Sequence, residues 1–163
     1  MTKITMREAI SQALMEEMDR DPAVFILGEE VGVWGGTYAV TKGFYDKYGP
    51  DRIKDTPIAE NAIIGAAIGA AMVGQRPIAE LMTINFAFSA MDYIVNQAPK
   101  LHYMFGGQFR VPMVMRTAST TAVGRPLRTS AAKLGPERTM ARRFGRTSAA
   151  TSFWPTPPGC DWK

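Results

Sequence analysis

The sequence predicts an α/β fold in which a parallel sheet is flanked by helices. Two observations carry this prediction: short continuous apolar runs, as at residues 24–27 and 111–116, and the helical segments that lie between such runs. Apolar runs of this length are typical of strands that are buried on both faces. Strands that alternate with helices favour a parallel sheet with right-handed crossovers and helices on both faces.

The regular elements are expected within residues 1–117. Thr5 and Glu8 form a capping box, in which a hydroxyl and a carboxylate satisfy free amides at a helix start. Apolar residues then recur at helical spacing until Asp21-Pro22 ends the helix. After it we expect strands at 24–27, 52–56, 76–82 and 111–116, helices at 41–48, 60–74 and 86–104, and a Gly-rich loop at 29–36.

Residues 118–163 differ from the rest of the chain in composition. They contain no Ile and a single Val, and Arg, Thr, Ser, Ala and Pro dominate. No strand or helix period can be counted, and so little apolar surface cannot offset the entropy lost on ordering the segment. We therefore expect one domain over residues 1–117 and a largely disordered basic tail over residues 118–163.

The composition excludes several classes of protein. The net charge of +4 comes from the tail, which holds eight Lys or Arg against two acidic residues, so the charge does not indicate a nucleic-acid partner. The longest apolar stretch, residues 62–73, is too short to span a bilayer, and no targeting segment is visible. The single Cys160 and the single His102 give no Cys or His metal cluster within one chain. We expect a cytoplasmic protein with no membrane partner and no metal of its own.

The candidate site lies where three loops leave the sheet. Parallel α/β proteins bind ligands beyond the carboxyl ends of their strands. Residues 28–32, 55–60 and 81–86 each follow an expected strand, so they should meet at this edge. They bring carboxylates together with apolar and aromatic side chains, and no phosphate-binding G-x-G-x-x-G or Walker pattern is present. Spacing alone thus predicts a cleft that carries carboxylates.

Glu60 is the first candidate within this cleft, because it opens a helix of small residues. Its carboxylate either stabilises the helix N-terminus through the macrodipole or is a buried functional group with a tuned pKa. Spacing alone favours the first interpretation. Glu29 and Glu30 are consistent with solvated loop acids, and Met82 and Phe86 with core side chains.

Several stretches together resemble the beta subunits of pyruvate dehydrogenase and of the related branched-chain and acetoin enzymes. The resemblance is carried by TMREA at 5–9, GEEVG at 28–32, DTPIAE at 55–60, RPIAE at 76–80, MTINF at 82–86 and residues 96–107. It runs almost unbroken from about residue 4 to residue 116. The phrase T-P-I-x-E, followed by a small-residue helix and M-T-x-N-F, is a specific combination.

The resemblance implies a transketolase-like pyrimidine-binding domain and thiamine diphosphate as cofactor. In this family the beta chain receives the aminopyrimidine ring, while the alpha chain supplies the diphosphate and Mg²⁺ site. Glu60 matches the essential glutamate, which hydrogen-bonds a ring nitrogen of the aminopyrimidine. Phe86 matches the aromatic residue that stacks on this ring, with Met82 and Ile58 shaping the pocket. Glu29 matches an acidic residue close to the ring.

The implied activity is oxidative decarboxylation of pyruvate with acyl transfer to lipoyl groups, with the cofactor as electron sink. The implied partners are an alpha subunit, in a heterotetramer, and the lipoyl acyltransferase core. Asp92 matches an acid in a water-filled passage between active sites. Branched-chain 2-oxo acid and acetoin dehydrogenases remain alternatives, because the alpha chain shares the substrate pocket. A chain that starts at the pyrimidine domain favours this split type over transketolase.

The chain departs from the family after Arg116. The family continues with a Gly-rich loop, an A-Q-H-S segment and a second domain, and residues 117–163 show none of these. Codons for residues 153–163, read in a shifted frame, can encode L-A-H-T-P-G-L-R-L-E, which resembles a stretch of this family. We hypothesise a frameshift shortly after Arg116, and we expect the chain as written to be inactive by itself.

Two other classes of function remain open. The chain could be a binding protein whose basic tail engages nucleic acid or an acidic partner, and such binding would depend strongly on salt. It could also be a non-catalytic assembly module whose Gly/Ala helix packs against a partner. Substitution of Glu60 separates the assembly module from the enzyme, because only cofactor turnover depends on that carboxylate.

Overall fold

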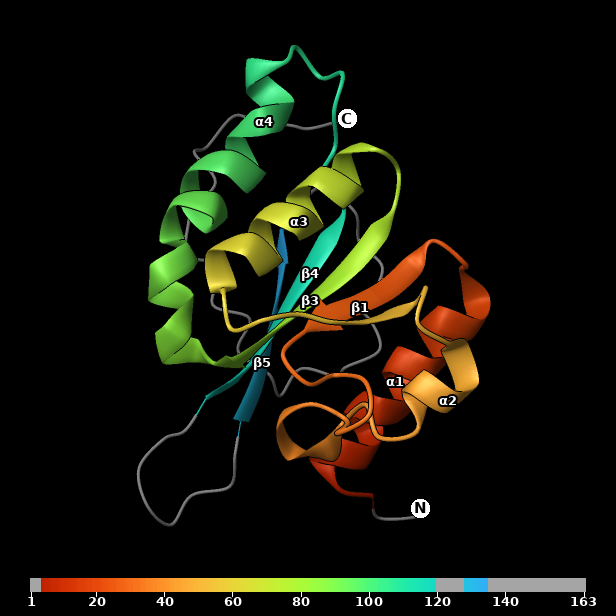
Figure 1. Cartoon of the computed structure of the whole chain (residues 1–163). Helices are drawn as coiled ribbons and strands as arrows, with labels where there is room; N and C mark the ends of the chain where they lie inside the picture. Colours follow the sequence, from red (N-terminus) through yellow and green to blue (C-terminus); the bar gives the residue numbers. More distant parts are fainter. Residues whose placement is uncertain (1–3, 120–127, 135–163) are drawn as a thin grey trace.

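The computed structural model describes residues 4–119 and 128–134, which contain a sheet of five strands with helices on both faces (Figure 1). The strands are β1 (Val24–Gly28), β2 (Ile53–Asp55), β3 (Arg76–Thr83), β4 (Met113–Ser119) and β5 (Arg128–Leu134). They lie in the order β2-β1-β3-β4-β5. The first four are mutually parallel, and β5 runs antiparallel to β4. The predicted parallel α/β sheet is therefore confirmed.

The helices are divided between the two faces of the sheet. α1 (Met6–Arg20) and α2 (Phe44–Tyr48) pack on one face, and α3 (Glu60–Met72) and α4 (Ala98–Met104) pack on the other (Figure 1). The capping box predicted at the first helix is present, with Thr5 as the N-cap. The crossovers between parallel strands thus place helices on both faces, as a sheet of this kind requires.

Neighbouring residues of the central strands point into two separate cores. On β1, Ile26 belongs to the core beneath α1 and α2, whereas Leu27 belongs to the core beneath α3 and α4. On β3, Ile78 and Ala79 divide in the same way. Successive side chains of a strand point to opposite faces, so a strand covered on both sides is apolar at most positions. This explains the continuous apolar runs in the sequence.

The segment predicted as one helix over residues 86–104 is not a uniform α-helix. It consists of a 3-10 segment, η2 (Ile84–Ala90), a π-helical turn at Tyr93–Gln97, and α4. Pro99 lies in the first turn of α4. Proline cannot donate the backbone hydrogen bond of a helix interior, so it is accommodated at the start of a new helical segment, directly after the π-turn.

β5 lies within residues 118–163, where the sequence showed no strand period. Its seven residues pair along β4, from Leu134 opposite Met113 to Arg128 opposite Ser119. The expectation of no regular element is wrong for these residues, because the open edge of β4 offers backbone groups that an extended segment can pair with whatever its side-chain pattern. Residues 120–127 and 135–163 lie outside the described residues, so the rest of the predicted tail stays a prediction.

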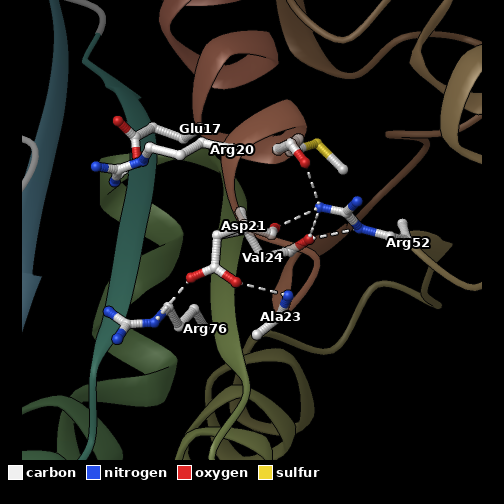
Figure 2. Close-up of polar contacts among 8 residues, drawn as sticks. Glu17, Arg20, Asp21, Ala23, Val24, Arg52 and Arg76 are labelled. Atoms are coloured by element: carbon white, nitrogen blue, oxygen red, sulfur yellow. Dashed lines mark hydrogen bonds and ion pairs between the residues drawn. The ribbon is translucent and has the colours of Figure 1, made fainter.

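A polar cluster joins α1 to the amino ends of the strands (Figure 2). Arg52, directly before β2, donates hydrogen bonds to the backbone oxygens of Met18 and Asp21 at 2.9 Å and of Val24 at 2.8 Å. The Asp21 carboxylate forms an ion pair with Nε of Arg76, at the start of β3, at 3.1 Å. These bonds satisfy carbonyl groups that the end of α1 and the following turn leave without helical partners.

Candidate functional site

The carboxyl ends of β1 and β2 meet where the sequence predicted a cleft. Gly28, the last residue of β1, is in register with Asp55, the last residue of β2. The N–H of Gly32 donates to Oδ1 of Asp55 at 2.7 Å, and the N–H of Thr56 donates to the carbonyl of Gly28 at 2.9 Å. Two of the three segments predicted to come together are thus in direct contact.

The third segment reaches the same edge through Ser89 of η2. Its hydroxyl lies 2.9 Å from the carbonyl oxygen of Phe86 and 3.4 Å from Oε2 of Glu60. One hydroxyl proton serves one acceptor at a time, and the shorter distance favours the carbonyl. The 3.4 Å distance to Glu60 shows that η2 lies beside the first turn of α3, although the hydroxyl proton is directed to the carbonyl of Phe86. An exposed serine carries no local signal in the sequence, and this residue was not among the predicted ones.

Glu29 is the most unusual carboxylate at this edge. The residue is 5% exposed, and its Oε1 is buried without a hydrogen-bond partner in the described part of the chain. Burial raises the pKa of Glu29, and the neighbouring carboxylates of Glu60 and Glu30 raise it further. Buried polar atoms without a partner are uncommon in folded proteins, and a ligand is one of the groups that can satisfy them.

Glu60 opens α3 and is half-buried. The residue before it, Ala59, is the N-cap and provides no side-chain hydrogen bond to the helix. A carboxylate in this first turn is favoured by the positive end of the helix macrodipole. It also lies close enough to Glu29 to raise the pKa of that residue. The structure therefore brings the two predicted carboxylates together, and their roles at the site stay predictions.

The predicted apolar residues belong to the same edge at different depths. Phe86 is 45% exposed on η2, and Ile58 is 79% exposed in the loop before α3. Met82 is half-buried near the end of β3. Exposed apolar side chains at such an edge offer surface to the ring of a ligand or to another chain. Contact of these three residues with a cofactor stays a prediction.

Asp92 is exposed and satisfied by neighbours along its own helical segment. Nδ2 of Asn96 donates to it at 2.7 Å, and Nε2 of Gln97 donates at 3.3 Å. These two hydrogen bonds lower the pKa of Asp92, with a smaller contribution from Lys100. The carboxylate is thus held ionised, and its place in a passage between active sites stays a prediction.

A second buried carboxylate, Glu80, has a cationic partner. Nη1 of Arg116 on β4 donates to Oε2 of Glu80, and the residues are 4% and 3% exposed. Burial raises the pKa of Glu80, and Arg116 opposes this shift. A Cβ atom on Gly36 would lie 2.7 Å from Oε1 of Glu80, so this pair also supports the loop after β1. An acid and an arginine inside apolar strands are the sequence signal that could have indicated the pair.

Two further features bear on the kind of site. Across residues 4–119 and 128–134, no three or more His, Cys, Asp or Glu side chains gather in a way that could hold a metal ion. None of the helices found there has the length and apolar character that a membrane span requires.

The chain belongs to the family described as the transketolase pyrimidine-binding domain, which matches residues 2–127. This match includes the edge that carries Glu29 and Glu60, and it extends beyond residue 117, where the sequence predicted the end of the domain. A parallel sheet with candidate ligand groups at its carboxyl edge is thus assigned to a defined class of domain.

The similarity to individual curated proteins is more specific than the match to the family. The chain is 51% identical over 122 residues to the pyruvate dehydrogenase E1 component subunit beta-1, mitochondrial, of Oryza sativa subsp. japonica, covering 75% of this chain and 33% of the relative. It is 55% identical over 114 residues to the pyruvate dehydrogenase E1 component subunit beta of Rickettsia bellii, covering 70% and 35%. The chain therefore spans about a third of the length of these relatives. A solved structure described as a split gene transketolase, inactive beta4 tetramer, aligns with a TM-score of 0.46 and 28% identity over 58% of this chain and 29% of that chain.

Proposed function

We propose that this chain binds the aminopyrimidine end of thiamine diphosphate as part of a pyruvate dehydrogenase beta subunit. The observation that carries the proposal is the buried, unpartnered oxygen of Glu29 beside the carboxylate of Glu60. Membership of the pyrimidine-binding family and the identity to named E1 beta subunits support it. Because the chain spans about a third of those relatives, the decarboxylation of pyruvate is proposed for the assembled enzyme.

The residues at the edge fit an aminopyrimidine. Such a ring presents both hydrogen-bond acceptors and donors, and two carboxyl groups, one with a raised pKa, can match both. Glu60 would hold a proton at a ring nitrogen, and Phe86 would pack on the ring face. Ile58 and Met82 would exclude water from the ring. Thiamine diphosphate, when bound, supplies the electron sink for loss of CO₂ from a 2-oxo acid.

The remaining parts of the proposal lie outside this chain. An alpha subunit would supply the diphosphate and Mg²⁺ site within a heterotetramer, and a lipoyl acyltransferase core would receive the acyl group. Branched-chain 2-oxo acid and acetoin dehydrogenases remain the alternative, because the pocket for the 2-oxo acid is shared with the alpha chain. A cytoplasmic location stays a prediction, since the relative from Oryza sativa is named as mitochondrial and the one from Rickettsia bellii is not.

Substitution Glu60→Gln tests the cofactor site in the chain co-purified with its alpha partner. We expect calorimetry to show thiamine diphosphate binding about tenfold or more weaker, because a charge-assisted hydrogen bond is lost. In a subunit that turns over, pyruvate decarboxylation should fall by about 10²–10⁴-fold, the usual size of a general acid–base contribution. Glu16→Gln, an exposed change on α1, is the matched control. Unchanged affinity in Glu60→Gln would favour the assembly-module alternative.

Resequencing the gene from codon 110 onward tests the proposed frameshift. A corrected frame that continues into the histidine segment and a second domain would support it. A frame that stands as written would contradict it, and we would then expect no decarboxylation by this chain even with its alpha partner and thiamine diphosphate. The binding experiment does not depend on this outcome, since it requires no turnover.

A further inference from the structure

The turn that carries Glu29 is held in place from the neighbouring strand. We infer that Asp55 is a positioning residue of the pyrimidine site: its carboxylate fixes the turn at residues 29–32 against the end of β2 and so keeps Glu29 buried beside Glu60. This inference rests on the proposed function, because it concerns the same site. Asp55 begins the DTPIAE stretch that carries the resemblance, but the sequence predicted no role for its side chain.

The contact between Asp55 and the turn is close. The N–H of Gly32 donates to Oδ1 of Asp55 at 2.7 Å, across 23 residues of sequence. A Cβ atom on Gly32 would lie only 2.6 Å from Oδ2 of the same carboxylate. The carboxylate therefore lies against the backbone of Gly32, and any larger residue at this position would displace it.

The other side of the turn is held independently, so the loop has little freedom once Asp55 is in place. The hydroxyl of Thr41 donates to the carbonyl of Val31 at 2.7 Å, and Val31 is completely buried. The N–H of Gly36 donates to the carbonyl of Glu30 at 2.7 Å. Glu30 has a φ of 52°, a left-handed conformation that costs free energy in a residue with a side chain and persists only where the surroundings impose it.

The bond from Asp55 and the burial of Glu29 are thereby connected. Glu29 precedes the strained Glu30 and lies at the end of the turn that joins β1, while Gly32 closes that turn onto β2. If the bond from Gly32 is lost, the left-handed conformation can relax and water can reach the carboxyl of Glu29. The negative charges of Glu60 on α3 and Glu30 on the turn both raise the pKa of this carboxyl. Relaxation of the turn weakens both of these contributions to the pKa.

The test follows the titration of Glu29 in the full chain without cofactor, by carbon NMR of its carboxyl group, assigned with Glu29→Gln. In Asp55→Ala we expect the midpoint to move down from its raised value toward the ordinary glutamate value of 4.5. Asp55→Asn keeps the Oδ1 acceptor and removes the charge, so we expect it to retain the raised midpoint. Gly32→Ala displaces the carboxylate from the other side and should act like Asp55→Ala.

Asp19→Ala is the matched control. Asp19 accepts hydrogen bonds from Lys47 and from Tyr48 on α2, so its loss disturbs α1 and α2 without touching the turn. We expect the titration of Glu29 to be unchanged in this variant. If Asp55→Ala does not fold, the other two variants still test the positioning role. A lowered midpoint of Glu29 in Gly32→Ala together with a retained midpoint in Asp55→Asn supports it.

The inference is overturned if Glu29 titrates as in the wild type in both Asp55→Ala and Gly32→Ala, or if Asp55→Asn shifts it as far as Asp55→Ala does. Calorimetry with thiamine diphosphate and the alpha partner separates this failure from failure of the proposed function. A wild-type chain that does not bind the cofactor contradicts the proposed function alone. Normal binding by the wild type, together with unchanged Glu29 titration in the variants, contradicts the positioning role alone.

Discussion

At the amino ends of the strands, Arg52 has backbone partners at Met18, Asp21 and Val24, whereas at the carboxyl ends Glu29 keeps a buried oxygen that no described residue satisfies (Figure 2 shows the amino-end cluster). Both groups are polar, and both lie directly beside a strand of the same sheet. The comparison shows that the two ends contribute differently. Hydrogen bonds at the amino end stabilise the fold, whereas the carboxyl end retains a buried carboxylate oxygen that no described residue satisfies and that a ligand can satisfy.

The pair formed by Glu80 and Arg116 makes this contrast sharper. It lies near the carboxyl ends, it is as buried as Glu29, and it contains a cation that compensates the charge of the carboxylate, although Oε1 of Glu80 also has no hydrogen-bond partner among the described residues. The fold is therefore able to place a cationic partner at this depth. Burial raises the pKa of Glu29, and two neighbouring carboxylates raise it further instead of compensating its charge. The absence of a cation beside the Glu29 carboxylate among the described residues is therefore a local property of the turn after β1.

The largest effect on stability is expected from Glu80→Gln. The substitution leaves Arg116 charged and buried without its partner, which typically costs about 3–5 kcal/mol of unfolding free energy. Urea unfolding followed by circular dichroism measures it. Replacing both residues by methionine removes the stranded charge and should recover most of the loss. A single variant as stable as the wild type would mean that the pair does not stabilise the sheet.

A smaller effect is expected from Arg52→Ala at the opposite end. The loss of its charge-assisted hydrogen bonds to part-buried carbonyl groups should cost roughly 2–3 kcal/mol, without changing the titration of Glu29. Arg20→Ala is the matched control, because Arg20 forms an ion pair with Glu17 on the surface of α1 and such pairs contribute about 0–1 kcal/mol. Equal losses of unfolding free energy in the two variants would show that the hydrogen bonds of Arg52 stabilise the fold no more than a surface ion pair does.

The smallest expected effect is a pH-dependent gain in Glu29→Gln. Because the pKa of Glu29 is raised in the folded protein, its proton stabilises the fold at low pH, and this contribution is lost as the pH rises through the folded pKa. Below the ordinary glutamate value of 4.5 the variant and the wild type should unfold alike. Above it the variant should become the more stable of the two. A constant difference at all pH values would contradict the raised pKa.

Much of the site could be predicted because its parts follow from chain order. Apolar runs mark the strands, parallel strands end at one edge, and the loops that carry Glu29 and Glu60 must therefore approach each other. Their actual contacts could not be predicted. Asp55, Ser89 and the Glu80–Arg116 pair act through partners 23 to 36 residues away in the sequence, and their bonds depend on register between strands and on the depth of burial.

The sequence by itself determined the elements that depend on local interactions. Thr5 and Glu8 start α1 through bonds within one turn, and continuous apolar runs mark β1 and the beginning of β4. The tertiary structure decided the strand order, the pairing of β5 with β4 and the burial of Glu29. It also decided that residues 84–104 divide into a 3-10 segment, a π-helical turn and α4. These features depend on which distant segments satisfy one another's backbone groups and exclude water, and no local pattern encodes that choice.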